Sequence, residues 1–267
     1  MAFPALILAH WLARFSAMSG RMLVSLALLL LSSSLHASEP IRIAAASDLR
    51  YALDDIIENY HQAHPDADIE VIYGSSGKMT TQIIHGAPYD MFFSADIAYP
   101  EKLQELGMTA TEPSIYAIGR IVIWSSTLDA ASLTLEDLGS DAIRRIAIAQ
   151  PNHAPYGLRA QEALQSAGVW EAVQDKLVFG ENIAQTAQMA RTGAAQVGII
   201  ALSLARFPEL AEHGHHLIDE RLHKPLTQGY IVTRHGKDKP QARAFADYME
   251  SDAAHGIMSR YGFVLSQ

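Results

Sequence analysis

The stretch Ile41-Arg42-Ile43-Ala44-Ala45-Ala46-Ser47-Asp48-Leu49 decides the fold, because it joins a strand directly to a helix. Its first six residues are nearly all apolar and predict a short strand, and the helical spacing of apolar residues after Ser47 predicts a helix that ends before Pro65. A strand that runs into a helix N-terminus leaves free backbone N–H groups at the turn, and these groups with a serine hydroxyl suit an anion. Serine is also a common helix cap, so this stretch alone leaves both roles open for Ser47.

The composition argues against several classes of function. The chain has 267 residues, 49% hydrophobic and 18% charged, as in a globular protein of one large or two modest domains. Its formal net charge is −9 and it has no run of Lys and Arg, so a nucleic-acid binder is not expected and an anion must be bound by local donors. Because the chain has no cysteine, disulfides, thiolate metal sites, thiol catalysis and a cysteine-linked lipid anchor are excluded.

The first 37 residues have the pattern of a cleavable signal peptide. Two arginines precede an apolar run, residues 22–31, which is too short to span a membrane, and Ala37 supplies a small residue at the cleavage point. We therefore expect residues 1–37 to be removed on export to the periplasm and the mature chain to begin at Ser38. An uncleaved membrane anchor is the alternative.

Apolar strands alternate with amphipathic helices along the rest of the chain. After the first helix, residues 68–73 predict a second strand, Gly74-Ser75-Ser76-Gly77 a tight turn, and Met79 the start of another helix. Further strands are expected at residues 91–93, 145–149, 197–201 and 227–233. The alternation predicts an α/β fold with parallel packing, in which ligands bind beyond the carboxyl ends of the strands.

Short motifs spread over residues 40–267 carry a resemblance to a known family. In order they are AAAS at 44–47, YGSSG at 73–77, GAPYD at 86–90, FSAD at 93–96, PNHAPYG at 151–157, GENI at 180–183, VGI at 197–199 and RYGF at 260–263. Each motif alone is weak, but their order and spacing together are specific. The chain resembles the periplasmic molybdate-binding proteins of ABC transporters, which are type II solute-binding proteins.

The resemblance implies a two-lobed periplasmic solute-binding protein fold, with mixed, mainly parallel sheets and a cleft between the lobes. One lobe would comprise residues 38–117 and 228–267 and the other residues 118–227, with a hinge near Ala117 and Thr227. An oxyanion would bind in the cleft, and closure of the lobes would present the protein to a membrane ABC permease with its ATPase. The protein would be a monomer without a cofactor, and not an enzyme.

By position, the resemblance implies that the oxyanion is bound by Ser47, Ser76, Tyr156 and Ile183. These residues would hold a metal only in the form of the molybdate or tungstate anion. Ser47 and Ser76 would donate hydrogen bonds from the first lobe, and the Tyr156 hydroxyl and the Ile183 backbone N–H from the second. The family has two branches, and this chain resembles the one with a hydroxyl at Tyr156 rather than at position 201, which is Ala201 here. A rigid cleft can reject the smaller sulfate, but it cannot separate molybdate from tungstate by size.

Asp48 fits such a site least well. A carboxylate in the first turn of a helix interacts favourably with the helix dipole, but it can only accept hydrogen bonds and repels a dianion. In the branch that this chain resembles, an amide side chain can occupy this position. We therefore expect Asp48 to turn away from the cleft, toward solvent or a nearby backbone amide.

Three other functions are alternatives to molybdate binding. The Gly74-Ser75-Ser76-Gly77 turn matches neither a nucleophile elbow nor a P-loop, and no nucleophile–base pair is indicated, so an enzyme is not expected. The tract from His213 to His223 holds four of the 12 histidines and can bind a metal ion, but no carboxylate is arranged beside it. Sulfate, phosphate or thiosulfate is the nearest alternative ligand, because it would use the same fold and site.

Overall fold

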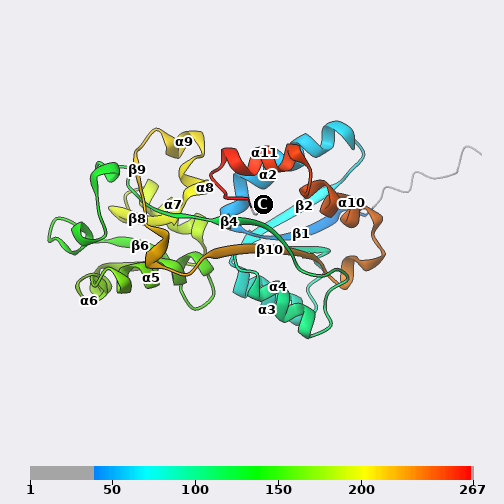
Figure 1. Ribbon diagram of the computed structural model, residues 1–267, viewed down its shortest axis with the longest axis horizontal. Coiled ribbons are helices and arrows are strands. Elements are labelled where there is room, and N and C mark those ends of the chain that lie inside the picture. Colours follow the sequence, from blue (N-terminus) through cyan, green and yellow to red (C-terminus); the bar gives the residue numbers. More distant parts are fainter. Residues whose placement is uncertain (1–38, 266–267) are drawn as a thin grey trace, which may run out of the picture. The chain divides into compact units, whose positions relative to one another are not determined.

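A computed structural model of the protein describes residues 39–265, in which the strands form two five-stranded sheets (Figure 1). The expected signal peptide lies outside the described residues. Both sheets belong to one compact unit that begins at Pro40. No helix among the described residues has the length and apolarity that a bilayer span needs.

The first sheet has the strand order β2-β1-β3-β10-β4. The inner strand β1 (Ile41–Ala46) pairs in parallel with β2 (Ile69–Gly74) and β3 (Met91–Ser94). The late strand β10 (Leu226–Val232) pairs antiparallel with β3 and with β4 (Ser114–Gly119). The first sheet therefore combines an early part of the chain with a segment that returns from the second sheet.

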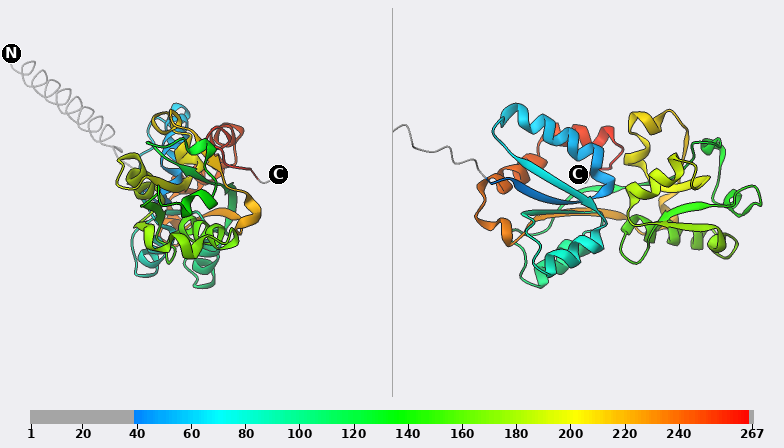
Figure 2. Two further views of the ribbon diagram at one scale, coloured as in Figure 1. Left: turned by 90° about the vertical axis from the view of Figure 1, so that its left-hand side faces the viewer. Right: turned by 180° about the vertical axis from the view of Figure 1, so that it is seen from behind.

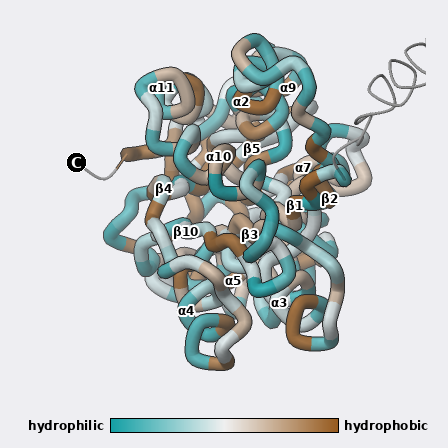
Figure 3. Tube along the Cα trace, turned by 90° about the vertical axis from the view of Figure 1, so that its right-hand side faces the viewer, coloured by the Kyte–Doolittle hydropathy of each residue, from teal (hydrophilic) through white to brown (hydrophobic). Residues whose placement is uncertain are grey.

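Helices cover both faces of the first sheet (Figures 1 and 2). On one face lie α2 (Arg50–Ala63), α10 (Pro240–Met249) and α11 (Asp252–Arg260), and on the other α3 (Ser76–Ile84) and α4 (Ala98–Glu105). In Figure 3 hydrophobic stretches mark the strands β1, β2 and β3 between these helices. The residues of β1 alternate between the two faces, since Ile43 and Ala45 pack with α2 and Ala44 packs with α3.

The second sheet has the strand order β7-β6-β8-β5-β9. Here β6 (Ile146–Ala149) pairs in parallel with β7 (Leu177–Gly180) and β8 (Val197–Ala201), whereas β5 (Ile121–Trp124) pairs antiparallel with β8 and β9 (His215–Leu217). Figure 1 shows α5 (Pro155–Ser166) and α6 (Trp170–Val173) along one face, and α7 (Ile183–Arg191), α8 (Leu202–Ala205) and α9 (Pro208–Ala211) along the other. The predicted α/β class with mixed sheets is confirmed. The expectation that the sheets are mainly parallel is wrong, because β10 and β5, which follow the crossings between the sheets, each pair antiparallel with two strands, so that each sheet contains two parallel and two antiparallel strand pairs.

Short 3-10 helices complete the described chain. They are η1 (Ser47–Leu49), η2 (Ala130–Ser132), η3 (Glu136–Gly139), η4 (Gln174–Lys176), η5 (Glu220–Leu222) and η6 (His235–Asp238). Of these, η1 leads directly from β1 into α2, so the helix expected after Ser47 begins with one tighter turn.

The chain changes sheet at Arg120, between β4 and β5, and returns between β9 and β10. Positions 118 and 119 of β4 pair with positions 227 and 226 of β10, so all four positions belong to the first sheet. The lobe boundaries near 117 and 228 that the resemblance implies therefore fall inside β4 and β10, because the backbone pairing of these strands continues to positions 119 and 226.

Candidate anion-binding site

The carboxyl ends of strands from both sheets meet around one small cavity. The residues that line it lie at or just beyond the ends of β1, β2, β3, β6 and β7. They are Ala46, Ser47, Asp48, Gly74, Ser75, Ser76, Ala95, Ala154, Pro155, Tyr156 and Ile183. The structure thus brings together all four residues that the resemblance assigned to an oxyanion, from four segments of the chain, and all four are buried.

The N-terminal ends of several helices face this cavity. α3 begins at Ser76, α5 at Pro155, α7 at Ile183, and η1 at Ser47. The first N–H groups of a helix have no acceptor within the helix, and the helix dipole makes this end positive. Such ends stabilise a negative charge without a cationic side chain, and the residues that line this cavity include no Lys, Arg or His.

Neither serine caps its own helix through its side chain. The Ser47 Oγ accepts a hydrogen bond of 3.2 Å from the backbone N–H of Ala184, in the first turn of α7. The Ser76 Oγ accepts one of 3.0 Å from the N–H of Ala95, just beyond β3. Each hydroxyl oxygen is therefore held by a backbone donor, and its own hydrogen is available to a further acceptor.

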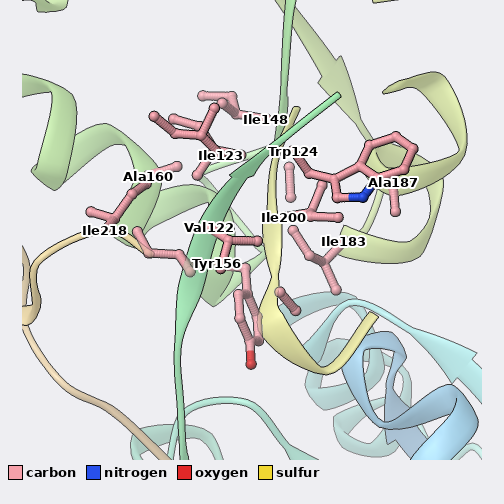
Figure 4. Packing of buried hydrophobic residues seen from close by; sticks show 14 of the residues in the cluster. Val122, Ile123, Trp124, Ile148, Tyr156, Ala160, Ile183, Ala187, Ile200 and Ile218 are labelled. Atoms are coloured by element: carbon pink, nitrogen blue, oxygen red, sulfur yellow. The ribbon is translucent and has the colours of Figure 1, made fainter. Parts of the chain in front are cut away.

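The N-terminus of α7 is fixed by its capping residue. The Asn182 side chain accepts a hydrogen bond of 2.9 Å from the N–H of Gln185. Ile183 follows as the first helical residue, and its side chain packs in the core of the second sheet (Figure 4). This packing holds the backbone N–H of Ile183 at the cavity, where a first helical residue has no acceptor of its own.

Tyr156 joins the second sheet to the first. Its ring packs in the core of the second sheet, and its hydroxyl oxygen points out of that cluster (Figure 4). The hydroxyl donates to Asp48 Oδ2 at 3.0 Å and accepts from Gln228 Nε2 at 2.9 Å. That Tyr156 donates to a ligand stays a prediction, because in this structure its hydrogen is donated to a carboxylate.

The prediction that Asp48 turns away from the cleft is wrong. Asp48 is buried and lines the cavity, and its Oδ2 accepts hydrogen bonds from Tyr156 and, at 2.9 Å, from Gln228 Nε2. Burial raises the pKa of Asp48 to about 6, although the hydrogen bonds from Gln228 and Tyr156 act to lower it. The expectation considered only the ligand, solvent and nearby backbone amides as neighbours of Asp48. It failed because it omitted the hydrogen-bond donors that other strands and helices supply.

Sequence reasoning missed Gln228 and Tyr116. Gln228 is a fully buried polar residue on β10, and its Oε1 accepts a hydrogen bond of 2.6 Å from the Tyr116 hydroxyl on β4. This bond fixes which end of the amide faces Asp48. The sequence signal for Gln228 is a glutamine within a strand of mostly apolar residues. The sequence alone does not show which carboxylate this glutamine contacts.

Further contacts beside the cavity join residues of the two sheets. The Gly77 N–H donates to the His153 carbonyl at 2.9 Å, and Ser75 Oγ lies 3.0 Å from His153 Nδ1. Burial, together with the charge of Lys78, lowers the pKa of His153 and favours its neutral form. Two pairs of charged residues add to these contacts, Arg159 with Asp96 at 3.1 Å and Lys78 with Glu181.

The histidine tract does not form a metal centre in the part of the chain that the structure describes. Among residues 39–265, no group of three or more His, Asp or Glu side chains is arranged to hold a metal ion. His215 and His216 belong to the edge strand β9, and His223 Nδ1 lies 2.7 Å from the Lys224 carbonyl oxygen.

Comparisons with known proteins agree with this fold. Residues 41–264 match the family model of bacterial extracellular solute-binding proteins. The molybdate-binding protein ModA of Azotobacter vinelandii is 33% identical over 249 residues, which cover 92% of this chain and 97% of that protein. ModA of Rhodobacter capsulatus is 35% identical over 196 residues, which cover 72% and 75%. The solved structure of the periplasmic molybdate-binding protein of A. vinelandii matches with a TM-score of 0.79 at 28% identity, over 85% of this chain and 100% of that one.

Proposed function

The chain belongs to the family of bacterial extracellular solute-binding proteins, and we propose that its solute is molybdate, bound in the cavity between the two sheets. The observation that carries the proposal is the convergence of helix N-termini and two serine hydroxyls on this cavity. A tetrahedral dianion needs many hydrogen-bond donors, and neutral donors at helix N-termini supply them. The relatives named as molybdate-binding proteins support the choice among oxyanions.

Each proposed contact has a distinct chemical role. Ser47 and Ser76 donate hydroxyl hydrogen bonds to oxygens of the anion, and Ile183 donates its backbone N–H. Tyr156 adds a phenol hydroxyl from the other side of the cavity once its bond to Asp48 is released. Tungstate has nearly the same size and charge as molybdate, so the same contacts accept it equally well.

The proposal extends to transport. Residues 40–119 and 226–265 act as one lobe and residues 121–217 as the other, and they separate and close about the crossings near Arg120 and before Leu226. The closed, loaded protein delivers its anion to a membrane ABC permease with its ATPase. Residues 1–37 are the signal peptide that directs a monomeric mature protein to the periplasm.

Calorimetric titration of the mature protein, residues 38–267, tests the choice of anion. We expect saturable binding of molybdate and of tungstate at one site, and far weaker binding of sulfate, because a smaller ion leaves donors unpaired around it. Binding of sulfate in preference to molybdate, or heat with none of the anions, would contradict the proposal.

Phosphate is a second candidate, favoured by Asp48. An ionised carboxylate in the cavity can accept a hydrogen bond from the O–H of hydrogen phosphate, whereas molybdate and sulfate carry no such hydrogen near neutral pH. Phosphate therefore belongs in the same titration series. If it binds more tightly than molybdate at pH about 8, where Asp48 is ionised, the second candidate replaces the first.

A further inference from the structure

Asp48 places a carboxylate in a cavity that is proposed to bind a dianion. Its side chain is buried, and it follows Ser47 directly at the start of η1. A negative charge so close to a dianion weakens binding, most strongly where water is excluded. The hydrogen bonds of Asp48 show how this conflict can be resolved.

The two carboxylate oxygens of Asp48 have different surroundings. Oδ2 accepts hydrogen bonds from the Tyr156 hydroxyl at 3.0 Å and from Gln228 Nε2 at 2.9 Å. Oδ1 is buried and has no hydrogen-bond partner among the described residues. A buried oxygen without a donor is costly for an ionised carboxylate, but it is the natural place for the proton of a neutral carboxyl group.

Within residues 39–265, no cationic side chain is among the groups that shift the pKa of Asp48. The titratable groups that face it are Tyr156 from α5 and Tyr116 from β4, and burial together with the charge of Asp48 raises the pKa of both phenols well above the usual value, so they are neutral. β10 contributes only the amide of Gln228, and α8 the hydroxyl of Ser203, which donates to the Asp48 backbone carbonyl at 2.8 Å.

The cationic side chains that lie beside the cavity are paired elsewhere. Arg159 of α5 bonds to Asp96 at 3.1 Å and to Glu162 at 2.7 Å. Lys78 of α3 pairs with Glu181 at an exposed position. Burial consequently dominates at Asp48 and raises its pKa to about 6.

An ionised Asp48 opposes molybdate in two ways. It repels the dianion, and it takes the single hydrogen of the Tyr156 hydroxyl, which then cannot be donated to the ligand. A neutral Asp48 removes the repulsion and accepts hydrogen bonds less strongly, which frees the Tyr156 hydrogen for the ligand. We infer that molybdate binding is coupled to the uptake of one proton by Asp48, so that the bound site holds a dianion beside a neutral carboxyl group.

This inference rests on the proposed function and specifies how the affinity of the same site for molybdate depends on pH. The proton comes from solvent, molybdate remains a dianion, and no covalent bond forms or breaks. Because a bound dianion raises the proton affinity of Asp48 further, molybdate affinity falls by up to about tenfold per pH unit above about pH 6. The site thereby favours molybdate at mildly acidic pH.

Proton-linked calorimetry tests the coupling directly. Mature wild-type protein is titrated with sodium molybdate from about pH 5.5 to about pH 8.5, in two buffers with different ionisation enthalpies at each pH, which yields the number of protons taken up. We expect close to one proton near pH 7.5 and a steady weakening of affinity as pH rises. Uptake of no proton, with a Kd that is constant over this range, would overturn the inference.

Asp48→Asn is the matched variant. The asparagine keeps an oxygen to accept from Tyr156 and Gln228, and its NH2 group takes the place of Oδ1, as a neutral carboxyl group does. We expect this variant to take up no proton and to bind molybdate with a pH-independent Kd. Persistent proton uptake in the variant would assign the coupling to another group, such as His153, and contradict the inference.

The two proposals fail differently. If molybdate binds to the wild-type protein without proton uptake, the proposed function stands and the coupling is wrong. If molybdate binds to neither protein at any pH, the proposed function is wrong and the coupling with it. The wild-type proton count needs no variant, so the test is decisive even if Asp48→Asn folds poorly.

Discussion

The Ser76 hydroxyl is held in place by one hydrogen bond and can still donate another. Its Oγ accepts from the Ala95 N–H at 3.0 Å, and its hydrogen is available to a ligand in the cavity. We expect Ser76→Ala to weaken molybdate binding by roughly tenfold to a hundredfold, since a hydrogen bond to a charged group contributes about 1.5–3 kcal/mol. Calorimetry measures the change. Thr81→Ala, which removes an exposed hydroxyl from the same helix, is the control and should bind normally.

Asp48 should also make the stability of the protein depend on pH. Burial raises the pKa of Asp48 from 3.8 to about 6, so the folded state holds this proton more tightly than the unfolded state. Stability from this group is therefore full below about pH 4 and is lost as pH rises toward 6, where ionisation costs on the order of 1–3 kcal/mol.

Urea denaturation of wild type and Asp48→Asn measures this cost. At pH about 8 we expect the variant to have the larger free energy of unfolding, and the difference should vanish near pH about 4. A variant less stable than wild type at pH about 8 would mean that the ionised carboxylate stabilises the fold.

At the scale of elements, α3 approaches the loop before α5 more closely than a side chain allows. A Cβ at Gly77 would lie 2.9 Å from the His153 carbonyl oxygen and 3.0 Å from its Cα. Alanine at this position suits the helix, but it pushes the two sheets apart at the cavity. We expect Gly77→Ala to weaken molybdate binding at least about tenfold while the protein stays folded by circular dichroism.

The control for this variant is another helical glycine. A Cβ at Gly256 in α11 meets nothing within 4 Å, so Gly256→Ala should leave molybdate affinity unchanged. Equal affinity of the Gly77→Ala variant and wild type would show that close approach of α3 and His153 is not needed for binding.

The sequence predicts the elements well because their signals are local. Apolar spacing predicts α2, and the alternation of strands and helices predicts ligand binding beyond the carboxyl ends of the strands, where Ser47 and Ser76 follow β1 and β2. The strand expected at 227–233 agrees with β10 to within one residue, whereas the lobe boundaries expected near 117 and 228 fall inside β4 and β10, because pairing between these two strands continues to positions 119 and 226.

At the scale of the whole molecule, the missing information is which distant residues meet. Asp48 and Gln228 are separated by 180 positions, and Asp48 and Tyr156 by 108. A local pattern cannot show that two donors from different sheets will face one carboxylate, so the expectation for Asp48 failed although its position in η1 was foreseen. The resemblance to a family supplied the grouping of Ser47, Ser76, Tyr156 and Ile183, which no periodicity contains.

The two sheets cooperate around a single cavity, and the central claim is that an oxyanion sits there between helix N-termini. Anomalous diffraction from crystals of the mature protein grown with molybdate tests this claim most directly, because molybdenum scatters anomalously and its position needs no assumption about the ligand. We expect one strong peak in the cavity, with oxygens of the anion within hydrogen-bond distance of Ser47, Ser76 and the Ile183 N–H. A strong peak elsewhere, such as at the histidine tract, or a cavity without a peak at saturating molybdate, would contradict the account.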